Sequence, residues 1–272
     1  MNIKIKTLLA VILFLVSFIS STSSFSQKQN IQNNWKKFYD EVGMEGAFAI
    51  YNQKNKEYTL YNPAFFREEF LPASTFKIFN SLVGIETGII ADENFIIKWD
   101  GMDKGYPLWN KDQDLREAFK NSTVWYYQEL ARRVGGKDLK IWLDRAKYGN
   151  TDTSGGIDMF WLTGGLRISM EQQIDFLKRL QADQLPFSKR SMDIVKNIMI
   201  REITPEYTIR SKTGWIGNTG ANTGWYVGYV ELKNNIYFFA NYLKDSDASD
   251  PNFAKARIEI TNKILKSLKI IK

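Results

Sequence analysis

One segment in the first third of the chain is apolar on almost every side. Residues 71–88 read LPASTFKIFNSLVGIETG. Pro72 suits the first turn of a helix, and apolar side chains occupy most positions from Phe76 to Ile85. A helix with this pattern is stable only when other elements surround it, so we expect the rest of the chain to pack around it.

This helix also carries a lysine, which is costly to bury. Ser74 and Lys77 are three residues apart, so their side chains share one face of the helix. An uncharged amine at that position can take the proton of a hydroxyl, which makes Ser74 a candidate nucleophile. The S-x-x-K pattern alone is common, and its alternative interpretation is an exposed helix start with a solvated lysine.

The sequence contains no histidine and no cysteine. A Ser-His-Asp triad, a Cys-His pair and a histidine-ligated metal centre are therefore excluded, and a general base must come from Lys, Asp, Glu or Tyr. The lack of cysteine also excludes disulfides and argues against a lipid anchor. We expect no metal.

The N-terminus has the pattern of an export signal. Lys4 and Lys6 precede an apolar run at 8–19 that only Ser17 interrupts, and small residues flank Phe25. We expect residues 1–26 to be a signal peptide cleaved near Ser26, and residues 27–272 to form one domain secreted to the periplasm. The run is short for a membrane span, so we expect no stable membrane association after cleavage; an uncleaved anchor is the alternative.

The composition favours a globular protein with a large core and a small ligand. The chain has 272 residues, of which 44% are apolar, and removal of Lys4 and Lys6 lowers the formal charge from +7 to +5. The basic residues are scattered, and the densest group, 255–272, has the spacing of an amphipathic helix, so we expect no nucleic-acid binding. The mild positive charge suits anionic small molecules, and we expect a monomer or a homodimer.

The order of elements predicts the fold class. We expect helices at 27–41, 115–134 with a break at 121–123, 139–148, 169–181, 188–200 and after Asp250-Pro251, strands at 46–51, 57–61, 208–212, 223–232 and 236–243, and irregular structure at 91–114. This order predicts an α+β fold with an antiparallel sheet built from N- and C-terminal strands, flanked by helices, with a mostly helical insert. A ligand cleft is expected between the sheet and the insert.

Three more short motifs follow the S-x-x-K tetrad in the chain. They are Ser122-Thr123-Val124, Tyr148-Gly149-Asn150 and Lys212-Thr213-Gly214. Together the four motifs resemble those of the penicillin-recognising serine enzymes, specifically the class D, OXA-type β-lactamases, which carry S-x-x-K, S-x-V, Y-G-N and K-T-G. The S-D-N motif of class A enzymes is absent. With the segment 161–164, similar to the W-x-x-G of the family, and Arg257, the resemblance spans nearly all of residues 27–272.

The resemblance implies hydrolysis of β-lactam antibiotics, and hence resistance to them, through an acyl-enzyme on Ser74. The backbone N–H groups of Ser74 and Trp215 would stabilise the oxyanion. Lys212, with a permanent positive charge, would bind the substrate carboxylate together with the Thr213 hydroxyl and the Arg257 guanidinium. Gly214 would let the backbone approach closely. Further substrate contacts are expected from the side chains of Val124, Leu162, Trp109, Tyr148 and Asn150.

The resemblance also implies that Lys77 reacts with CO2 to form a carbamate, N6-carboxylysine, which is the general base. Apart from CO2 or bicarbonate no cofactor is expected. A solvated lysine is neutral only roughly once in 2,500 molecules at pH 7, so burial must lower its pKa. We expect Phe76, Val124, Leu162 and Trp161 to line its pocket, the Trp161 indole to hydrogen-bond the carbamate, and Ser122 to relay a proton.

Other interpretations of these residues remain open. Trp161 and Tyr148 could be core aromatics, Asn150 a turn cap, and Arg257 a surface ion-pair residue. As a whole, the domain could be a β-lactam sensor that stays acylated, although such sensors carry membrane spans and a protease ahead of the domain. It could also be a peptidoglycan DD-peptidase, for which polar residues would be expected in place of Val124 and Leu162. The departures of Trp215 and the 216–223 loop from the commoner family pattern leave the substrate range open.

Overall fold

A single seven-stranded sheet forms the centre of the molecule. The computed structural model describes residues 28–218 and 220–272, so the predicted signal peptide lies outside the described residues. The strand order is β1-β3-β2-β7-β6-β5-β4. The strands are β1 (Lys28–Ile31), β2 (Glu45–Asn52), β3 (Glu57–Tyr61), β4 (Ile200–Ile203), β5 (Tyr207–Asn218), β6 (Ala221–Leu232) and β7 (Asn235–Asp245). Strands from both ends of the chain therefore build one sheet, as the sequence predicted.

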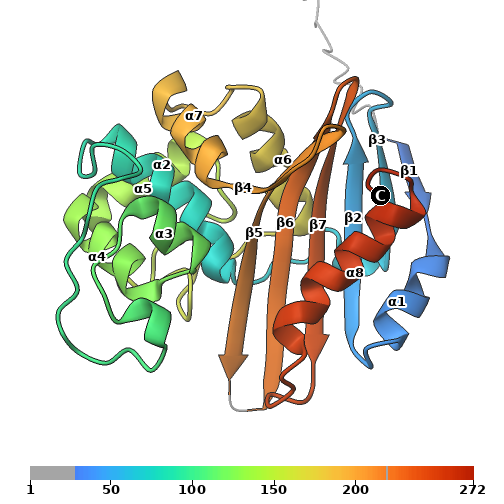
Figure 1. The fold of residues 1–272 in the computed structure, drawn as a ribbon, viewed down its shortest axis with the longest axis horizontal. Coiled ribbons are helices and arrows are strands. Elements are labelled where there is room, and N and C mark those ends of the chain that lie inside the picture. Colours follow the sequence, from blue (N-terminus) through green and yellow to red (C-terminus); the bar gives the residue numbers. More distant parts are fainter. Residues whose placement is uncertain (1–27, 219) are drawn as a thin grey trace, which may run out of the picture.

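Helices cover both faces of this sheet (Figure 1). On one face lie α1 (Lys36–Asp40) and α8 (Phe253–Ser267). On the other lie α2 (Lys77–Glu86), α3 (Leu115–Lys120), α4 (Val124–Val134), α5 (Gly136–Ala146), α6 (Met170–Gln181) and α7 (Lys189–Ile198). A hydrophobic core lies on each face of the sheet, and the side chains of β6 alternate between the two. Trp225 and Val227 pack toward the helical insert, and Tyr226 and Val230 pack toward α8. The predicted α+β plan is confirmed.

Helix α2 is the buried element that its sequence predicted. A 3-10 turn, Ala73–Phe76, leads into it, and every residue from Ala73 to Ile85 is buried. Further 3-10 turns occur at Asn33–Trp35, Pro63–Phe65 and Pro107–Trp109. Among the described residues, no helix is both long enough and apolar enough to cross a membrane.

Several predicted elements were wrong in extent or type. The helix expected at 27–41 is replaced by β1, a 3-10 turn and the short α1, because residues 28–31 pair with the free edge of β3. This pairing is parallel, so the sheet is antiparallel except at that edge. The helix expected to reach Ile200 ends at Ile198, where the chain enters β4 and pairs with β5.

Strand β5 is the element whose length was most underestimated. It runs from Tyr207 to Asn218 and pairs with β6 along its whole length, whereas the sequence predicted residues 208–212. Gly214 and Gly217 interrupt the alternation of side chains that marks a strand, although a glycine backbone pairs normally. Helix α5 likewise begins at Gly136, three residues before the expected start.

Candidate active site

The candidate nucleophile lies in the 3-10 turn ahead of α2. The backbone N–H of Ala73 donates a hydrogen bond of 3.0 Å to the carbonyl oxygen of Trp161, and the indole of Trp225 donates one of 2.9 Å to that of Leu71. Ala73 adopts a φ of 50°, a left-handed conformation that costs about 1–2 kcal/mol outside glycine. The surrounding structure thus holds Ser74 in a strained turn, as is common at functional sites.

The amine of Lys77 lies against the hydroxyl of Ser74. The distance between Lys77 Nζ and Ser74 Oγ is 2.7 Å, and the lysine is completely buried. In the described part of the chain, no carboxylate forms an ion pair with Lys77, and burial lowers the pKa of its amine from 10.5 to about 7. The predicted buried lysine next to the serine is confirmed, and the solvated-lysine alternative is wrong.

Of the four residues predicted to line Lys77, two are buried and two are half-buried, and the prediction omitted Tyr127. Phe76 and Trp161 are buried and stack with ring centroids 5.0 Å apart, while Val124 and Leu162 are half-buried. The ring of Tyr127, which the sequence analysis missed, lies 5.2 Å from Lys77 Nζ. Tyr127 is three residues after Val124 in α4, so the helical period could have placed both on the same face.

Ser122 and Lys212 meet although 90 residues separate them. Lys212 Nζ donates a hydrogen bond of 3.0 Å to Ser122 Oγ and one of 3.1 Å to the carbonyl oxygen of Thr213. Ser122 lies in the break between α3 and α4 and has a φ of 55°, a left-handed conformation. Burial, followed by the charges of Lys77, Arg257 and Arg201, lowers the pKa of Lys212 well below its ordinary value and so opposes the permanent charge that the sequence predicted.

Gly214 allows the 3-10 turn to approach β5. A Cβ atom at this position would lie 2.9 Å from the carbonyl oxygen of Pro72, closer than real Cβ atoms come, and 3.2 Å from Thr75 Cγ2, which is tighter than most such contacts. Strand β4 pairs with β5 only as far as Arg210, so the outer edge of β5 is open to the turn at Trp215. The backbone N–H groups of Ser74 and Trp215 therefore belong to two segments that pack directly together.

Arg257 reaches the same strand from α8 on the other face of the sheet. It is 4% exposed and donates hydrogen bonds to the carbonyl oxygens of Gly214 and Ala254, the second at 3.3 Å. Its guanidinium lies 5.7 Å from the ring centroid of Trp215, and its Nε has no partner among the described residues. Burial lowers its pKa to about 10. The alternative of a surface ion pair is therefore wrong.

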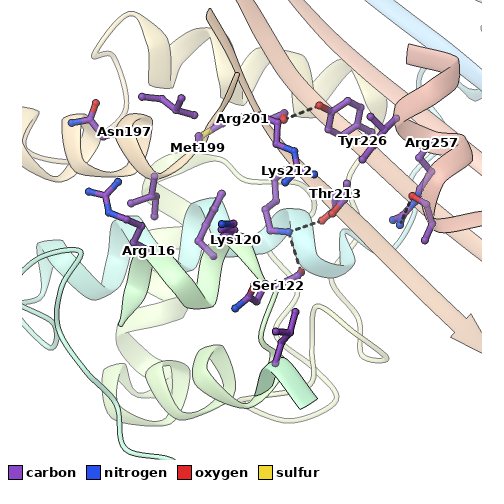
Figure 2. Close-up of a pocket in the computed structure, with 18 of the residues that line it drawn as sticks. Arg116, Lys120, Ser122, Asn197, Met199, Arg201, Lys212, Thr213, Tyr226 and Arg257 are labelled. Atoms are coloured by element: carbon purple, nitrogen blue, oxygen red, sulfur yellow. Dashed lines mark hydrogen bonds between the residues drawn. The ribbon is translucent and has the colours of Figure 1, made fainter. Parts of the chain in front are cut away.

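A cavity of about 770 Å³ opens between the sheet and the helical insert (Figure 2). It lies where the sequence predicted a ligand cleft. Ser122, Lys212, Thr213 and Arg257 line it together with residues of α3, α7, β4, β6 and α8. Ser74 is not part of this lining and is 8% exposed. Thr213 lines the cavity and the next residue, Gly214, packs against the turn that carries Ser74, so the cavity lies close to this turn.

The five residues expected to make further substrate contacts all lie outside the cavity lining: Val124, Leu162, Trp109, Tyr148 and Asn150. Tyr148 is 1% exposed and packs edge-on against Phe76 with ring centroids 5.7 Å apart. The side chain of Asn150 bonds to backbone groups of Gly165, Arg167 and Asp152 within its own loop. The Trp109 indole donates a hydrogen bond of 3.1 Å to the carbonyl oxygen of Asn121. Direct substrate contact by these five residues stays a prediction.

The arrangement contains no grouping that suits a metal ion. Over residues 28–218 and 220–272, no cluster of three or more acidic, histidine or cysteine side chains is placed to bind one. The groups that can act chemically are a serine hydroxyl, two buried amines of lowered pKa, a second serine and a guanidinium. Such a set suits acyl transfer to a serine, with a lysine in place of histidine.

Comparisons with known proteins agree with this geometry. A family model for the penicillin-binding protein transpeptidase domain matches residues 26–266. The β-lactamase OXA-48 of Klebsiella pneumoniae is 39% identical over 258 residues, which cover 95% of this chain and 96% of that protein. The chain therefore belongs to the penicillin-binding protein transpeptidase domain family and, within it, to the class D serine β-lactamases.

Solved structures share the fold over almost their whole length. The class D β-lactamase YbXI from Nostoc is 45% identical, with a TM-score of 0.84, and the match covers 88% of this chain and 99% of that one. The C-terminal domain of the BlaR penicillin receptor of Bacillus licheniformis is 32% identical, with a TM-score of 0.85, covering 91% and 99%. The same fold therefore occurs both in enzymes and in a receptor domain.

Proposed function

We propose that this protein hydrolyses β-lactam antibiotics through an acyl-enzyme on Ser74 and thereby confers resistance to them. The observation that carries the proposal is the contact of 2.7 Å between Ser74 Oγ and the amine of Lys77, a completely buried lysine with a pKa of about 7. The names of the relatives, β-lactamases that match 95% of this chain or more, support the same activity.

The acylation step follows from the positions of the two serines. The Ser74 oxygen forms a bond to the lactam carbonyl carbon, and the C–N bond of the ring breaks. Backbone N–H groups of Ser74 and Trp215 stabilise the negative charge on the carbonyl oxygen in between. Ser122, which accepts a hydrogen bond from Lys212, delivers a proton to the departing nitrogen. The products of this step are an ester on Ser74 and an opened ring.

The environment of Lys77 fits a carbamate. Its amine is buried and half neutral near pH 7, and no described carboxylate competes for it. A neutral amine adds CO2 and releases one proton, so carbamylation requires only dissolved CO2 or bicarbonate. When carbamylated, Lys77 supplies the base for the Ser74 proton and for the water that later hydrolyses the ester. No metal takes part.

The substrate carboxylate is bound by Lys212, Thr213 and Arg257. Lys212 and Arg257 reach the cavity from opposite faces of the sheet, and Thr213, the residue after Lys212, also lines it. A bound carboxylate favours the protonated form of Lys212 and so raises the pKa that burial lowers. Binding of the anion thus favours the positive charge that holds it.

A β-lactam sensor domain is the second candidate. The similarity to the BlaR receptor domain favours it, since the two chains share the fold at 32% identity. The two functions differ in one step, because a sensor forms the same ester on Ser74 but does not hydrolyse it. A DD-peptidase would instead act on peptides and would not need a carbamate.

We further propose that residues 1–26 direct the chain to the periplasm and are removed near Ser26, and that residues 27–272 act as a monomer or homodimer without stable membrane association. The basic residues Lys4 and Lys6 and the apolar run after them support export. N-terminal sequencing of the mature protein and light scattering test both statements.

The decisive experiment measures turnover of a chromogenic cephalosporin by residues 27–272. Wild-type protein should hydrolyse many equivalents, and Ser74→Ala should keep its fold and lose at least about a thousandfold in rate. A single equivalent of product with a persistent ester on Ser74 in the mass spectrum would favour the sensor. Appreciable hydrolysis by Ser74→Ala would show that another nucleophile acts.

A further inference from the structure

The cavity extends well beyond the residues that the proposed reaction uses. Ser74 and Lys77 are absent from its lining, whereas Ser122, Lys212 and Arg257 are part of it. It therefore opens on the side that faces the leaving nitrogen and the carboxylate next to it. We call the region of the cavity away from Ser74 its far part. A substrate group bound there would be a substituent of the ring that bears the carboxylate.

Two further cations enter this far part. Lys120 comes from the end of α3 and Arg201 from β4, and both line the cavity that Lys212 also lines (Figure 2). In the described part of the chain, neither side chain makes an ion pair or a hydrogen bond. Arg116, which also lines the cavity, differs because Glu93 neutralises it at 2.8 Å.

The positive charge of the cavity is not compensated from within. None of the described lining residues is acidic, although Lys120, Arg201, Lys212 and Arg257 all contribute to the walls. Arg201 and Arg257 are among the groups whose charge disfavours protonation of Lys212. Like charges that face one cavity repel one another and concentrate anions, so a second anion there would relieve this repulsion.

Further hydrogen-bond donors line the cavity besides Lys120 and Arg201. The Tyr226 hydroxyl accepts a hydrogen bond of 3.0 Å from Ser211, which leaves its own proton available to a ligand. Arg257, at 4% exposure, keeps an unpartnered Nε on the same wall. One carboxylate next to Ser122 does not occupy all of these donors in a cavity of about 770 Å³.

We propose that Lys120 and Arg201 form a second anion subsite beside the carboxylate clamp. Its ligand is a compact anionic substituent, a carboxylate, sulfonate or phosphate, on the carboxylate-bearing ring of the β-lactam. This proposal rests on the proposed function, because the ring carboxylate fixes the orientation of the substrate. The subsite would make the enzyme prefer β-lactams with two acidic groups on that ring.

The test uses two cephalosporins that differ only in an acidic or a neutral substituent next to the ring carboxylate. The quantity measured is the ratio of their kcat/KM values. Lys120→Met and Arg201→Met should each lower this ratio about threefold, and the double variant about tenfold, since partly exposed charge contacts have modest effects. Lys137→Met is the matched control, because Lys137 is exposed in α5, has no ion-pair partner among residues 28–218 and 220–272 and lies outside the cavity, and it should leave the ratio unchanged.

A second measurement separates a substrate-borne anion from a free one. Inorganic phosphate should inhibit hydrolysis of the acidic cephalosporin more strongly in wild type than in the double variant if the subsite also takes free anions. If phosphate does not inhibit but the kcat/KM ratio falls as expected, the ligand of the subsite is restricted to substituents of the substrate. The proposal is overturned if the double variant keeps the wild-type melting temperature and also keeps the wild-type ratio of kcat/KM values. Wild-type protein that hydrolyses neither cephalosporin would instead refute the proposed function.

Discussion

The side-chain amide of Gln173 in α6 donates a hydrogen bond of 2.8 Å to the hydroxyl of Thr75, the residue directly after the nucleophile. That hydroxyl in turn donates one of 2.7 Å to the carbonyl oxygen of Pro72. Gln173 and Thr75 are each 1% exposed, so water does not replace either bond easily. Helix α6, 98 residues away in sequence, thus holds the turn that carries Ser74.

Gln173→Ala should therefore weaken both stability and catalysis. Loss of the buried bond should cost about 1–3 kcal/mol of the free energy of unfolding, and Tm should fall by roughly 2–4 °C for each kcal/mol. We also expect kcat to decrease, because the turn no longer fixes Ser74. Calorimetry and steady-state kinetics measure the two effects. Gln181→Ala, at the end of the same helix, is the control, and equal behaviour of both variants would contradict a role for Gln173.

Turnover should depend on bicarbonate most strongly below pH 7. A pKa of about 7 leaves half of the Lys77 amine neutral at that pH and only about one in a hundred at pH 5, so carbamylation weakens as pH falls. Degassed protein at pH 5–6 should show a burst that declines, and added bicarbonate should restore the rate. The same treatment at pH 8 is the control, with little effect expected. Turnover indifferent to bicarbonate, with no carbon-13 carbamate signal, would show that Lys77 acts as a free amine.

The walls around Lys77 provide an independent test of the carbamate. Val124→Asp admits water and a competing charge next to Tyr127, and Trp161→Ala removes a buried ring and its N–H. Both variants should need more bicarbonate than wild type for half-maximal activity. The measurement is a bicarbonate titration of folded variants. Unchanged titrations would mean that these side chains do not influence carbamylation.

Arg257→Ala should affect substrate binding rather than the chemistry of Ser74. Removing one side of the carboxylate clamp should cost about 1.5–3 kcal/mol of transition-state stabilisation, a loss of roughly 10- to 150-fold in kcat/KM. Lys255→Ala, on the exposed side of the same helix, is the control. Wild-type kcat/KM in Arg257→Ala would place the clamp on Lys212 and Thr213 alone.

The orientation of Trp215 should depend on Asn222. The Trp215 indole donates a hydrogen bond of 2.9 Å to the side-chain oxygen of Asn222. Asn222 is fully buried, and its side-chain N–H donates to the carbonyl oxygen of Asp247. A double-mutant cycle with Trp215→Phe and Asn222→Ala should give a coupling of about 0.5–1.5 kcal/mol in kcat/KM. Additive effects of the two substitutions would show that the bond has no influence on the site.

The sequence identified the elements whose pattern is local. The apolar run around Phe79 predicted the buried α2, and the spacing of Ser74 and Lys77 placed both side chains on one face, as found at 2.7 Å. Period-2 patterning predicted β2, β3, β6 and β7 within a few residues. Residues three apart on a helix and alternate residues on a strand have fixed relative positions, so these predictions needed no tertiary information.

Only the tertiary structure decided which distant segments meet. No sequence pattern predicted that residues 28–31 pair with β3, that β5 continues past its glycines, or that Gln173 contacts Thr75. Backbone pairing at a sheet edge depends on which edge is free. A buried polar contact likewise depends on which helices pack together. The lowered pKa of Lys212 has the same origin, since burial and the charges of Lys77, Arg257 and Arg201 act through space, across 11 to 135 positions of the chain.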